Sequence, residues 1–480
     1  MSRSLPRIIP WQGDTPQACH PFFYPYETEK ISWPETAGGH SEVVVVGAGL
    51  SGLTAAYFLR HRDLMVLEAG EQVGGVCQSG NYRGVPYPAG SAYFYYPWEA
   101  SWQEWHRELG LELDEALIAP PMSALFHEGR WHPNCFSEAG IRSLPVPRAG
   151  VDGLLKLAED LINLENVWDL GIDTLPLPEL DQVSLAHYLE VERGLPREVT
   201  MLLAPYCRSC LGAGPEAISA WAGLFFLMSE FSSGTRAVAF PEGNARLAQA
   251  LSQALPNPPR CRHTLVGLRP RGEGVDLLVW NGAAPGFYRW EAGAVILAVG
   301  KFLARRLLTP DWGWRWEDFQ LFRYSSYVVA ALCGQITLEA PGYENWITKA
   351  AEISDFILAP RVPGKGPRVM VAFAPQPYPQ GRKPLLQAQA EYQGRNLLAA
   401  LEDHFPGIAA EVEEVRLYRF GHAQVLPYPG FLTFLRGRFP RKQGRIILAH
   451  SDLEGLPCIE AAIVQGQKAA RRALAVLDQR

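Results

Sequence analysis

Short runs of apolar residues, separated by turns rich in glycine and proline, set the pattern of the chain. The first strong run is Glu42–Val46, in which four valines follow one glutamate. A continuous β-branched run of this kind is typical of a parallel strand that is buried on both faces. A helical pattern follows at Leu50–Arg60, and a second apolar run at Leu64–Leu67. Together these segments predict one βαβ unit.

The rest of the chain mixes helical and strand patterns without an internal repeat. Residues 1–40 are rich in proline and aromatic side chains, whereas a disordered tail would be poor in aromatics. We therefore expect an irregular arm that packs on the body. The mixed pattern predicts an α/β domain that shares the chain with an α+β domain. Helices are predicted at residues 153–163, 184–193, 244–255 and 459–478, and strands at 275–280, 294–299, 327–332, 369–373 and 446–449.

Composition and charge narrow the class of protein. Charged residues make up 20% of the chain and the formal net charge is −6, so neither a basic nucleic-acid-binding protein nor a highly charged disordered chain is expected. The longest apolar stretch, Ile218–Met228, is too short to span a bilayer. The N-terminus lacks the apolar segment of a secretion signal. Eight scattered cysteines are too few for a disulfide scaffold. These features predict a soluble, cytoplasmic protein with reduced thiols.

The strongest chemical motif directly follows the valine run and opens the predicted helix. Gly47 permits a tight turn, Gly49 lets the backbone approach a pyrophosphate, and Gly52 lets the helix sit close to the strand. The helix N-terminus offers unpaired N–H groups to the phosphates. Glu68, which ends the second strand, can accept hydrogen bonds from ribose hydroxyls and would repel a 2′-phosphate. The motif that predicts this dinucleotide site is Gly47, Ala48, Gly49, Leu50, Ser51 and Gly52.

Two further motifs are interpreted without a chemical role. The segment Gly212–Ala217 repeats the glycine spacing, but no buried strand precedes it and Pro215 lacks an N–H, so we interpret it as a turn. Cys207 and Cys210 form a single CxxC with no second pair of ligands, and structural zinc normally needs four. We interpret them as core thiols and predict no metal site.

The residues after Glu68 distinguish between dinucleotides. Segment 69–75, Ala-Gly-Glu-Gln-Val-Gly-Gly, resembles the extended FAD signature of the flavin amine oxidase superfamily, which also includes protoporphyrinogen oxidases, phytoene desaturases and carotenoid isomerases. Segments 241–251, 294–300, 446–452 and 459–472 resemble later parts of the family pattern, in the same order. The resemblance implies FAD as the cofactor. It further implies cofactor contacts at Ala69, Gly74, Gly75, Val76, Gly90, Ser91, Leu265, Asp452 and Ile459.

The same resemblance implies a Rossmann-like FAD-binding domain that is interleaved with an α+β substrate-binding domain. Residues 41–104, 236–300 and 441–480 fall to the FAD-binding domain, and residues 105–235 and 301–440 to the substrate domain. His422 and Tyr428 lie in a segment that passes close to the flavin in the family, so they are the candidates for catalysis. Many amine oxidases have a lysine on a strand near the flavin. The comparable strand, 324–329, has none, and we interpret Lys301 as a surface residue.

The predicted function is that of an FAD-dependent oxidoreductase. A small or lipophilic substrate would bind against the flavin, and a hydride would pass from a C–N or C–C bond to the flavin N5. Dioxygen is the expected acceptor for reoxidation. Two alternatives stay open: a desaturase or isomerase that acts on a polyene or porphyrinogen-like molecule, and a flavin-binding protein that has lost catalysis.

Overall fold

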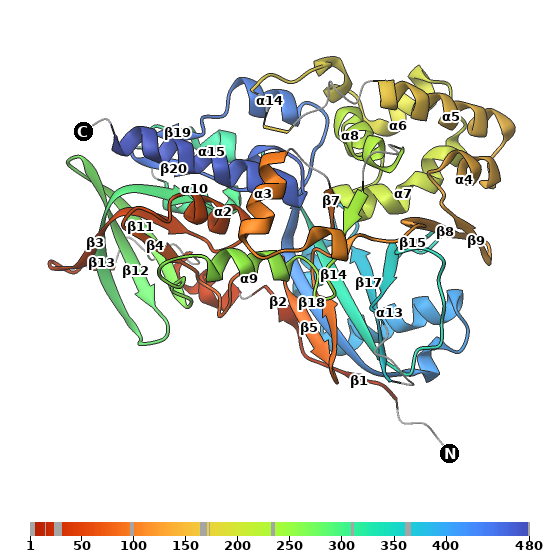
Figure 1. The fold of residues 1–480 in the computed structure, drawn as a ribbon, viewed down its shortest axis with the longest axis horizontal. Helices are drawn as coiled ribbons and strands as arrows, with labels where there is room; N and C mark the ends of the chain where they lie inside the picture. Colours follow the sequence, from red (N-terminus) through yellow and green to blue (C-terminus); the bar gives the residue numbers. More distant parts are fainter. Residues whose placement is uncertain are drawn as a thin grey trace.

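The structure is a computed structural model that describes residues 5–14, 16–23, 31–96, 100–163, 170–171, 173–231, 236–308, 312–360 and 366–478. Two large β-sheets dominate it, and helices cover both (Figure 1). Each sheet takes strands from segments that lie far apart in the sequence. This confirms the predicted architecture, an α/β FAD-binding fold interleaved with an α+β part. The domain boundaries themselves stay a prediction.

The first sheet has seven strands and contains the predicted βαβ unit. Its centre is parallel, in the order β4, β3, β13 and β20, and the register pairs Val43 with Leu64 on one side and with Ala294 on the other. The valine run is therefore a buried inner strand, as predicted. The strands are β3 (Ala37–Val46), β4 (Leu64–Leu67), β11 (His263–Arg271), β12 (Gly274–Asn281), β13 (Gly286–Leu297), β19 (Lys442–Gln443) and β20 (Ile446–Leu448).

Helices α2 (Leu50–Phe58), α9 (Ala245–Gln253) and α15 (Ile459–Leu477) share one apolar core with the first sheet. Val43 and Val45 point into that core, and Val44 and Val46 point into the core on the opposite face. Helix α15 crosses α2 at Gly466. The two helices are so close there that a Cβ at Gly466 would overlap the Ser51 carbonyl oxygen. This packing fixes the N-terminal ends of α2 and α15 at the cavity described below.

The second sheet has nine strands and carries helix α13 (Ala390–His404) on one face. The other face meets the hairpin of β5 (Ser79–Tyr82) and β6 (Val85–Pro88). The strands, in the order of the sheet, are β1 (Arg7–Ile8), β18 (Val412–Val425), β14 (Tyr324–Gly334), β17 (Arg368–Pro375), β16 (Asp355–Leu358), β15 (Glu344–Ile347), β8 (Ser123–His127) and β9 (Arg130–Pro133), with β2 (Gln12–Gly13) also on β18.

A group of helices forms a separate apolar core beside the second sheet. Helix α7 (Arg197–Leu211) runs through Pro205 and ends at Gly212, whose φ is +82°. Cys207 and Cys210 are free thiols inside this helix, and Gly212–Ala217 is the turn that follows it. The other members are α4 (Glu138–Ser143), α5 (Arg148–Asn163), α6 (Leu185–His187), a π-helix (Tyr188–Glu192) and α8 (Ala220–Phe231).

The remaining elements connect these layers. A two-stranded sheet joins β7 (Phe94–Tyr96) to β10 (Arg236–Val238). The short helices are α1 (His20–Phe23), α3 (Ala100–Glu108), α10 (Lys301–Leu307), α11 (Trp316–Phe319), α12 (Arg382–Gln387) and α14 (Phe431–Gly437).

The N-terminal arm is more regular than predicted. Its strands β1 and β2 pair in parallel with β18, because the edge of the second sheet offers free backbone groups to any neighbouring segment. The Asp14 carboxylate continues this docking by accepting a hydrogen bond of 2.6 Å from the Gly421 N–H. Of the arm, residues 1–4, 15 and 24–30 lie outside the described part.

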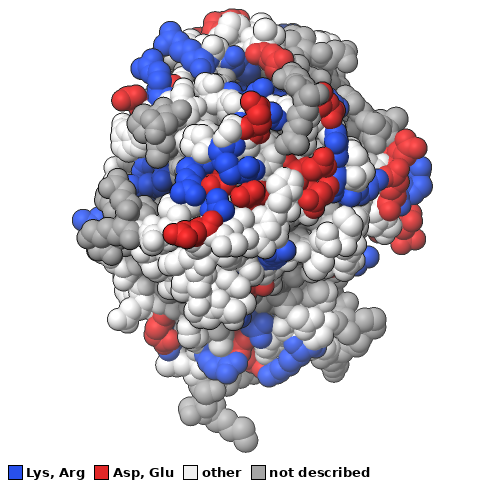
Figure 2. All heavy atoms as spheres, turned by 90° about the vertical axis from the view of Figure 1, so that its left-hand side faces the viewer, with Lys and Arg blue, Asp and Glu red and all other residues white. Residues whose placement is uncertain are grey.

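Acidic and basic side chains are mixed on the molecular face in Figure 2, which is the left-hand side of Figure 1. Elsewhere, Arg269, Arg271 and Arg289 surround the buried Asp276 carboxylate at distances of 3.0 to 3.1 Å. Within the described ranges, no helix combines the length and apolarity needed to cross a membrane.

Candidate active site

A single cavity of about 1510 Å³ joins the two sheets. Its volume exceeds the range of roughly 300–1,000 Å³ that is typical of small-molecule sites. The first sheet and its helices contribute one end of the lining, including Gly47, Gly49 and Glu68, and the second sheet contributes the other, including Glu344 and Asp355. The cavity is therefore large enough to hold a dinucleotide and a second molecule together.

At the first end, Glu68 is held in place by two backbone donors. Its carboxylate accepts hydrogen bonds from the Ala48 N–H at 2.8 Å and from the Gly70 N–H at 2.7 Å. Burial raises the pKa of Glu68, although these N–H groups oppose that shift. Ala69 and Leu265 line the same end of the cavity. The carboxylate at the strand end thus faces the place where the sequence predicts a ribose.

The glycines of segment 47–52, here called the glycine cradle, fall into two classes. A Cβ at Gly52 would overlap the Gly47 carbonyl oxygen, and one at Gly47 would lie 2.7 Å from the Ala298 carbonyl oxygen, so both positions need glycine for packing. A Cβ at Gly49 would meet nothing closer than the Gly75 Cα, at 3.9 Å. Gly49 also lines the cavity and bridges to Gly74. The space beside Gly49 is thus left open toward the cavity, which suits the approach of a pyrophosphate.

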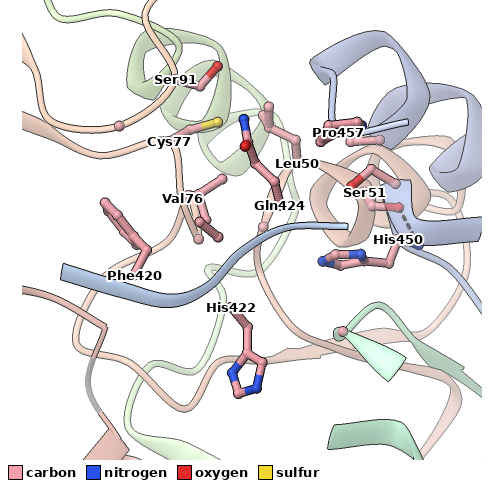
Figure 3. A pocket seen from close by; sticks show the side chains of 18 of the residues that line it. Leu50, Ser51, Val76, Cys77, Ser91, Phe420, His422, Gln424, His450 and Pro457 are labelled. Atoms are coloured by element: carbon pink, nitrogen blue, oxygen red, sulfur yellow. Dashed lines mark hydrogen bonds between the residues drawn. The ribbon is translucent and has the colours of Figure 1, made fainter. Parts of the chain in front are cut away.

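The middle of the cavity collects residues from five separate segments. Figure 3 shows strand β18 crossing it, with the side chains of His422 and Gln424 on opposite sides of the ribbon. The N-terminus of α15 opens onto this region at Ile459. A helix N-terminus stabilises negative charge nearby. The remaining sequence-predicted residues found here are Leu50, Ser51, Gly74, Gly75, Val76, Gly90 and Ser91.

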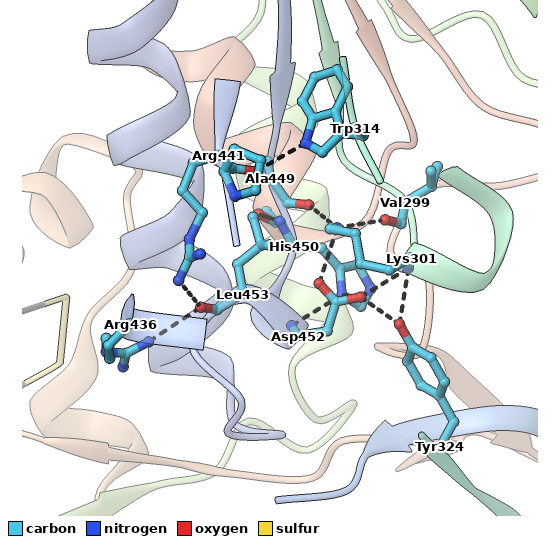
Figure 4. Close-up of polar contacts among 12 residues, drawn as sticks. Val299, Lys301, Trp314, Tyr324, Arg436, Arg441, Ala449, His450, Asp452 and Leu453 are labelled. Atoms are coloured by element: carbon cyan, nitrogen blue, oxygen red, sulfur yellow. Dashed lines mark hydrogen bonds and ion pairs between the residues drawn. The ribbon is translucent and has the colours of Figure 1, made fainter. Parts of the chain in front are cut away.

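Asp452 differs from the expectation of a direct cofactor contact. Its carboxylate is fully buried, accepts a hydrogen bond of 2.6 Å from the Tyr324 hydroxyl, and ion-pairs with Lys301 at 3.0 Å (Figure 4). The cavity wall is formed instead by the preceding residues, His450 and Ser451. The predicted cofactor contact of the Asp452 side chain is therefore wrong, because the carboxylate pairs with a buried lysine and does not line the cavity.

Lys301 is also not the surface residue that we expected. Its side chain is fully buried, and Nζ donates hydrogen bonds to the carbonyl oxygens of Val299 and Ala449 at 3.0 and 2.9 Å. These carbonyls follow the parallel strands β13 and β20. Lys301 therefore ties together the ends of two strands behind the cavity.

The two catalytic candidates are placed differently. His422 lines the cavity and stacks on Phe302, with ring centroids 3.8 Å apart. Burial lowers the pKa of His422 to about 3, so its imidazole is neutral at physiological pH. Tyr428 does not line the cavity. Its hydroxyl donates to the Leu321 carbonyl oxygen at 2.9 Å and its ring packs on Phe431, so the structure contradicts a catalytic role for Tyr428.

At the far end, three acidic residues that sequence reasoning missed meet around the cavity. Glu230 accepts a hydrogen bond of 2.5 Å from the Tyr95 hydroxyl, and Asp355 accepts one of 2.6 Å from the Ser354 hydroxyl. Among the described residues, Glu344 Oε2 is buried without a hydrogen-bond partner. Burial raises the pKa of all three carboxyl groups, that of Asp355 to about 7. Glu344 and Asp355 line the cavity directly.

No sequence motif marks this acidic group, because its members come from α8, β15 and β16 and meet only in the folded chain. Within the described ranges, no group of three His, Cys, Asp or Glu side chains is arranged to hold a metal ion.

The site geometry agrees with a comparison against protein families. The model of the family described as flavin containing amine oxidoreductase matches residues 50–474. The chain belongs to this family. It is therefore an FAD-dependent oxidoreductase, as the sequence predicted. A comparison with curated protein sequences finds no match.

Three solved structures show the same fold. A putrescine oxidase bound to putrescine has a TM-score of 0.68 at 19% identity, and the alignment covers 91% of this chain and 99% of that one. Cyclohexylamine oxidase from Brevibacterium oxydans IH-35A has a TM-score of 0.67 at 18% identity, covering 92% and 99%. A fatty acid isomerase from P. acnes that produces CLA has a TM-score of 0.65 at 15% identity, covering 90% and 98%.

The residues at the first end of the cavity fit FAD. The buried Glu68 carboxylate can accept from ribose hydroxyls, and the open space beside Gly49 leads to the N-terminus of α2. The position of each cofactor contact in this flavin amine oxidoreductase stays a prediction.

Proposed function

We propose that the protein oxidises a C–N bond of an amine that carries a second cationic group. The observation that supports this is the acidic end of the cavity, where Glu344 and Asp355 line the wall and Glu230 lies close enough to raise the pKa of Glu344. None of the three forms an ion pair with a described lysine or arginine, although the charge of Arg208 acts on Asp355 from a greater distance. Burying a carboxylate is costly unless a proton or a cation accompanies it. A cationic substrate group supplies that partner.

The chain's own residues would bind and orient such a substrate. Glu344 Oε2 would accept from the distal ammonium group, which holds the other end of the substrate toward the middle of the cavity. The rings of Phe225, Phe226 and Tyr327 line the space between and would cover the aliphatic part. When bound, FAD supplies the hydride acceptor. The amine would lose a hydride from carbon and a proton from nitrogen, and water would hydrolyse the resulting imine.

A second candidate is desaturation or isomerisation of a neutral, lipophilic molecule. The aromatic rings of Phe225, Phe226 and Phe420 favour it, since they make much of the lining apolar. The lack of a lysine on β14 also favours it, because that strand lines the cavity at Tyr324 and Tyr327. A buried carboxylate with an unused oxygen opposes it, because a neutral hydrocarbon leaves that oxygen without a partner.

Anaerobic reduction of the bound flavin separates the candidates. The test panel contains diamines, monoamines of matched chain length, and lipophilic polyenes, and the measurement is the loss of the yellow flavin absorbance. We expect diamines to reduce the flavin at the lowest half-saturating concentration. Reduction by polyenes alone would support the second candidate and exclude the first. If no compound reduces the bound FAD, the result would support the other alternative, a protein that binds flavin without catalysis.

The Glu344→Gln variant tests the carboxylate itself. We expect its KM for a diamine to rise about ten-fold or more, since a hydrogen bond to a charged group is lost. The KM for the matched monoamine should change little. Glu413→Gln is the control, because Glu413 lies at the surface and contacts Tyr82 and Arg83. Equal effects of E344Q on both amines would contradict the proposal.

A further inference from the structure

His450 adopts a backbone conformation that is rare outside glycine. Its φ and ψ are 121° and 147°, beyond even the left-handed helical region. A residue with a Cβ is strained there, and such strain persists only where the surrounding structure enforces it. The residue follows strand β20 and sits on the wall of the cavity. The fold therefore retains a histidine at a position where glycine would relax the backbone.

Three contacts fix this residue from the protein side. The His450 N–H donates to the Ser51 hydroxyl at 3.0 Å, and the Asp452 N–H donates to His450 Nδ1 at 3.2 Å. The Asp452 carboxylate also lies 3.2 Å from Nδ1. Both the N–H and the carboxylate of Asp452 are within reach of Nδ1, so the protein holds the ring at Nδ1 and leaves Nε2 for another partner. Within the described part of the chain, Nε2 makes no hydrogen bond, and about a third of the side chain (34%) is exposed to the cavity.

The place of the imidazole relates it to the cofactor. Ser51 belongs to the first turn of α2, the helix whose N-terminus follows the glycine cradle. A pyrophosphate binds at such a helix N-terminus. Figure 3 shows His450 beside Ser51 on the same wall. A ring nitrogen that is held there by Asp452, and that has no partner among the described residues, can donate to a phosphate oxygen when it carries a proton.

We propose that His450 binds the diphosphate of FAD through Nε2. Asp452 and Ser51 act as positioning residues that hold the ring, and the strained backbone is the cost of aiming a side chain into the cavity. The role concerns cofactor retention and is independent of the substrate that the enzyme oxidises.

Glycine substitution tests the proposal, because strain and contact predict opposite results. His450→Gly removes both the Cβ and the donor, and His450→Ala removes only the donor. The measurements are the FAD dissociation constant after reconstitution of the apoprotein, the temperature at which bound flavin is released, and the unfolding temperature of the apoprotein. We expect both variants to bind FAD about ten-fold or more weakly than the original chain, and the H450G apoprotein to unfold at a higher temperature than the H450A apoprotein, because both lose the imidazole but only glycine relaxes the backbone.

The controls keep the result decisive. Asn134 has a φ of +51° in an exposed turn, so Asn134→Gly relaxes a strained backbone away from the cavity and should leave FAD affinity unchanged. If H450A does not fold, H450G still reports the contact. An H450G variant that binds FAD as tightly as the original chain, or more tightly, would overturn the proposal.

Discussion

Lys301 and Asp452 form an ion pair in which both side chains are fully buried, with Nζ and Oδ1 3.0 Å apart. Burial by itself raises the pKa of Asp452, but the charges of His450 and Lys301 outweigh it and hold that pKa well below its usual range. The pair joins the start of α10 to the segment that carries His450 and Ser451. Its role is to support the cavity wall from behind.

Breaking this pair should destabilise the protein strongly. We expect Lys301→Met to cost about 3–5 kcal/mol of unfolding free energy, because it removes the fully buried ion-pair partner of the Asp452 carboxylate. Urea denaturation of the apoprotein measures the loss. Lys349→Met is the matched control, since Lys349 pairs with Glu128 at the surface and such pairs contribute at most about 1 kcal/mol. A small effect of K301M would show that Asp452 is protonated or solvated in the fold.

The glycine cradle should separate cofactor binding from folding. In Gly49→Ala the new Cβ has room on the protein side, so the apoprotein should fold with nearly unchanged stability but bind FAD about ten-fold or more weakly. In Gly52→Ala the Cβ overlaps the Gly47 carbonyl, so folding itself should suffer. Flavin fluorescence and thermal unfolding measure the two effects. Gly437→Ala, at an open position, should change neither.

Glu344 should destabilise the apoprotein at neutral and alkaline pH. The pKa of this carboxyl group is higher in the folded state than in the unfolded state, where it is about 4.3. The free energy of unfolding therefore falls as the pH rises from the unfolded pKa to the folded pKa. Glu344→Gln removes this effect, so the variant should melt roughly 2 °C higher than the original chain at pH 8. The difference should shrink at pH 5. A variant that is less stable at pH 8 would contradict an unpaired, buried carboxylate.

Asp355 gives the substrate affinity a pH dependence. Because burial raises its pKa to about 7, the acidic end gains negative charge as the pH rises through that value. The KM for a diamine should therefore fall between pH 6 and pH 8, while the KM for a monoamine should follow only the titration of its own amine. In Asp355→Asn the step near pH 7 should disappear. Its persistence would assign that step to another group.

The periodicity of the sequence and the spacing of its motifs predicted the first sheet and the dinucleotide site. The run Val43–Val46 predicted a buried parallel strand because valine favours that environment on both faces. The glycines that follow, with Glu68 at the next strand end, predicted the dinucleotide site because each has a local steric or hydrogen-bonding reason. These features are local, so the amino-acid order alone expresses them.

Only the tertiary structure decided the features that depend on long-range contact. The sequence around Lys301 gives no sign of burial, because its ion-pair partner, Asp452, lies 151 positions later in the chain. Glu230, Glu344 and Asp355 lie on three different elements, so no spacing in the sequence relates them. A carboxylate's effect depends on burial and on its neighbours, and both are set only when the two sheets close around one cavity.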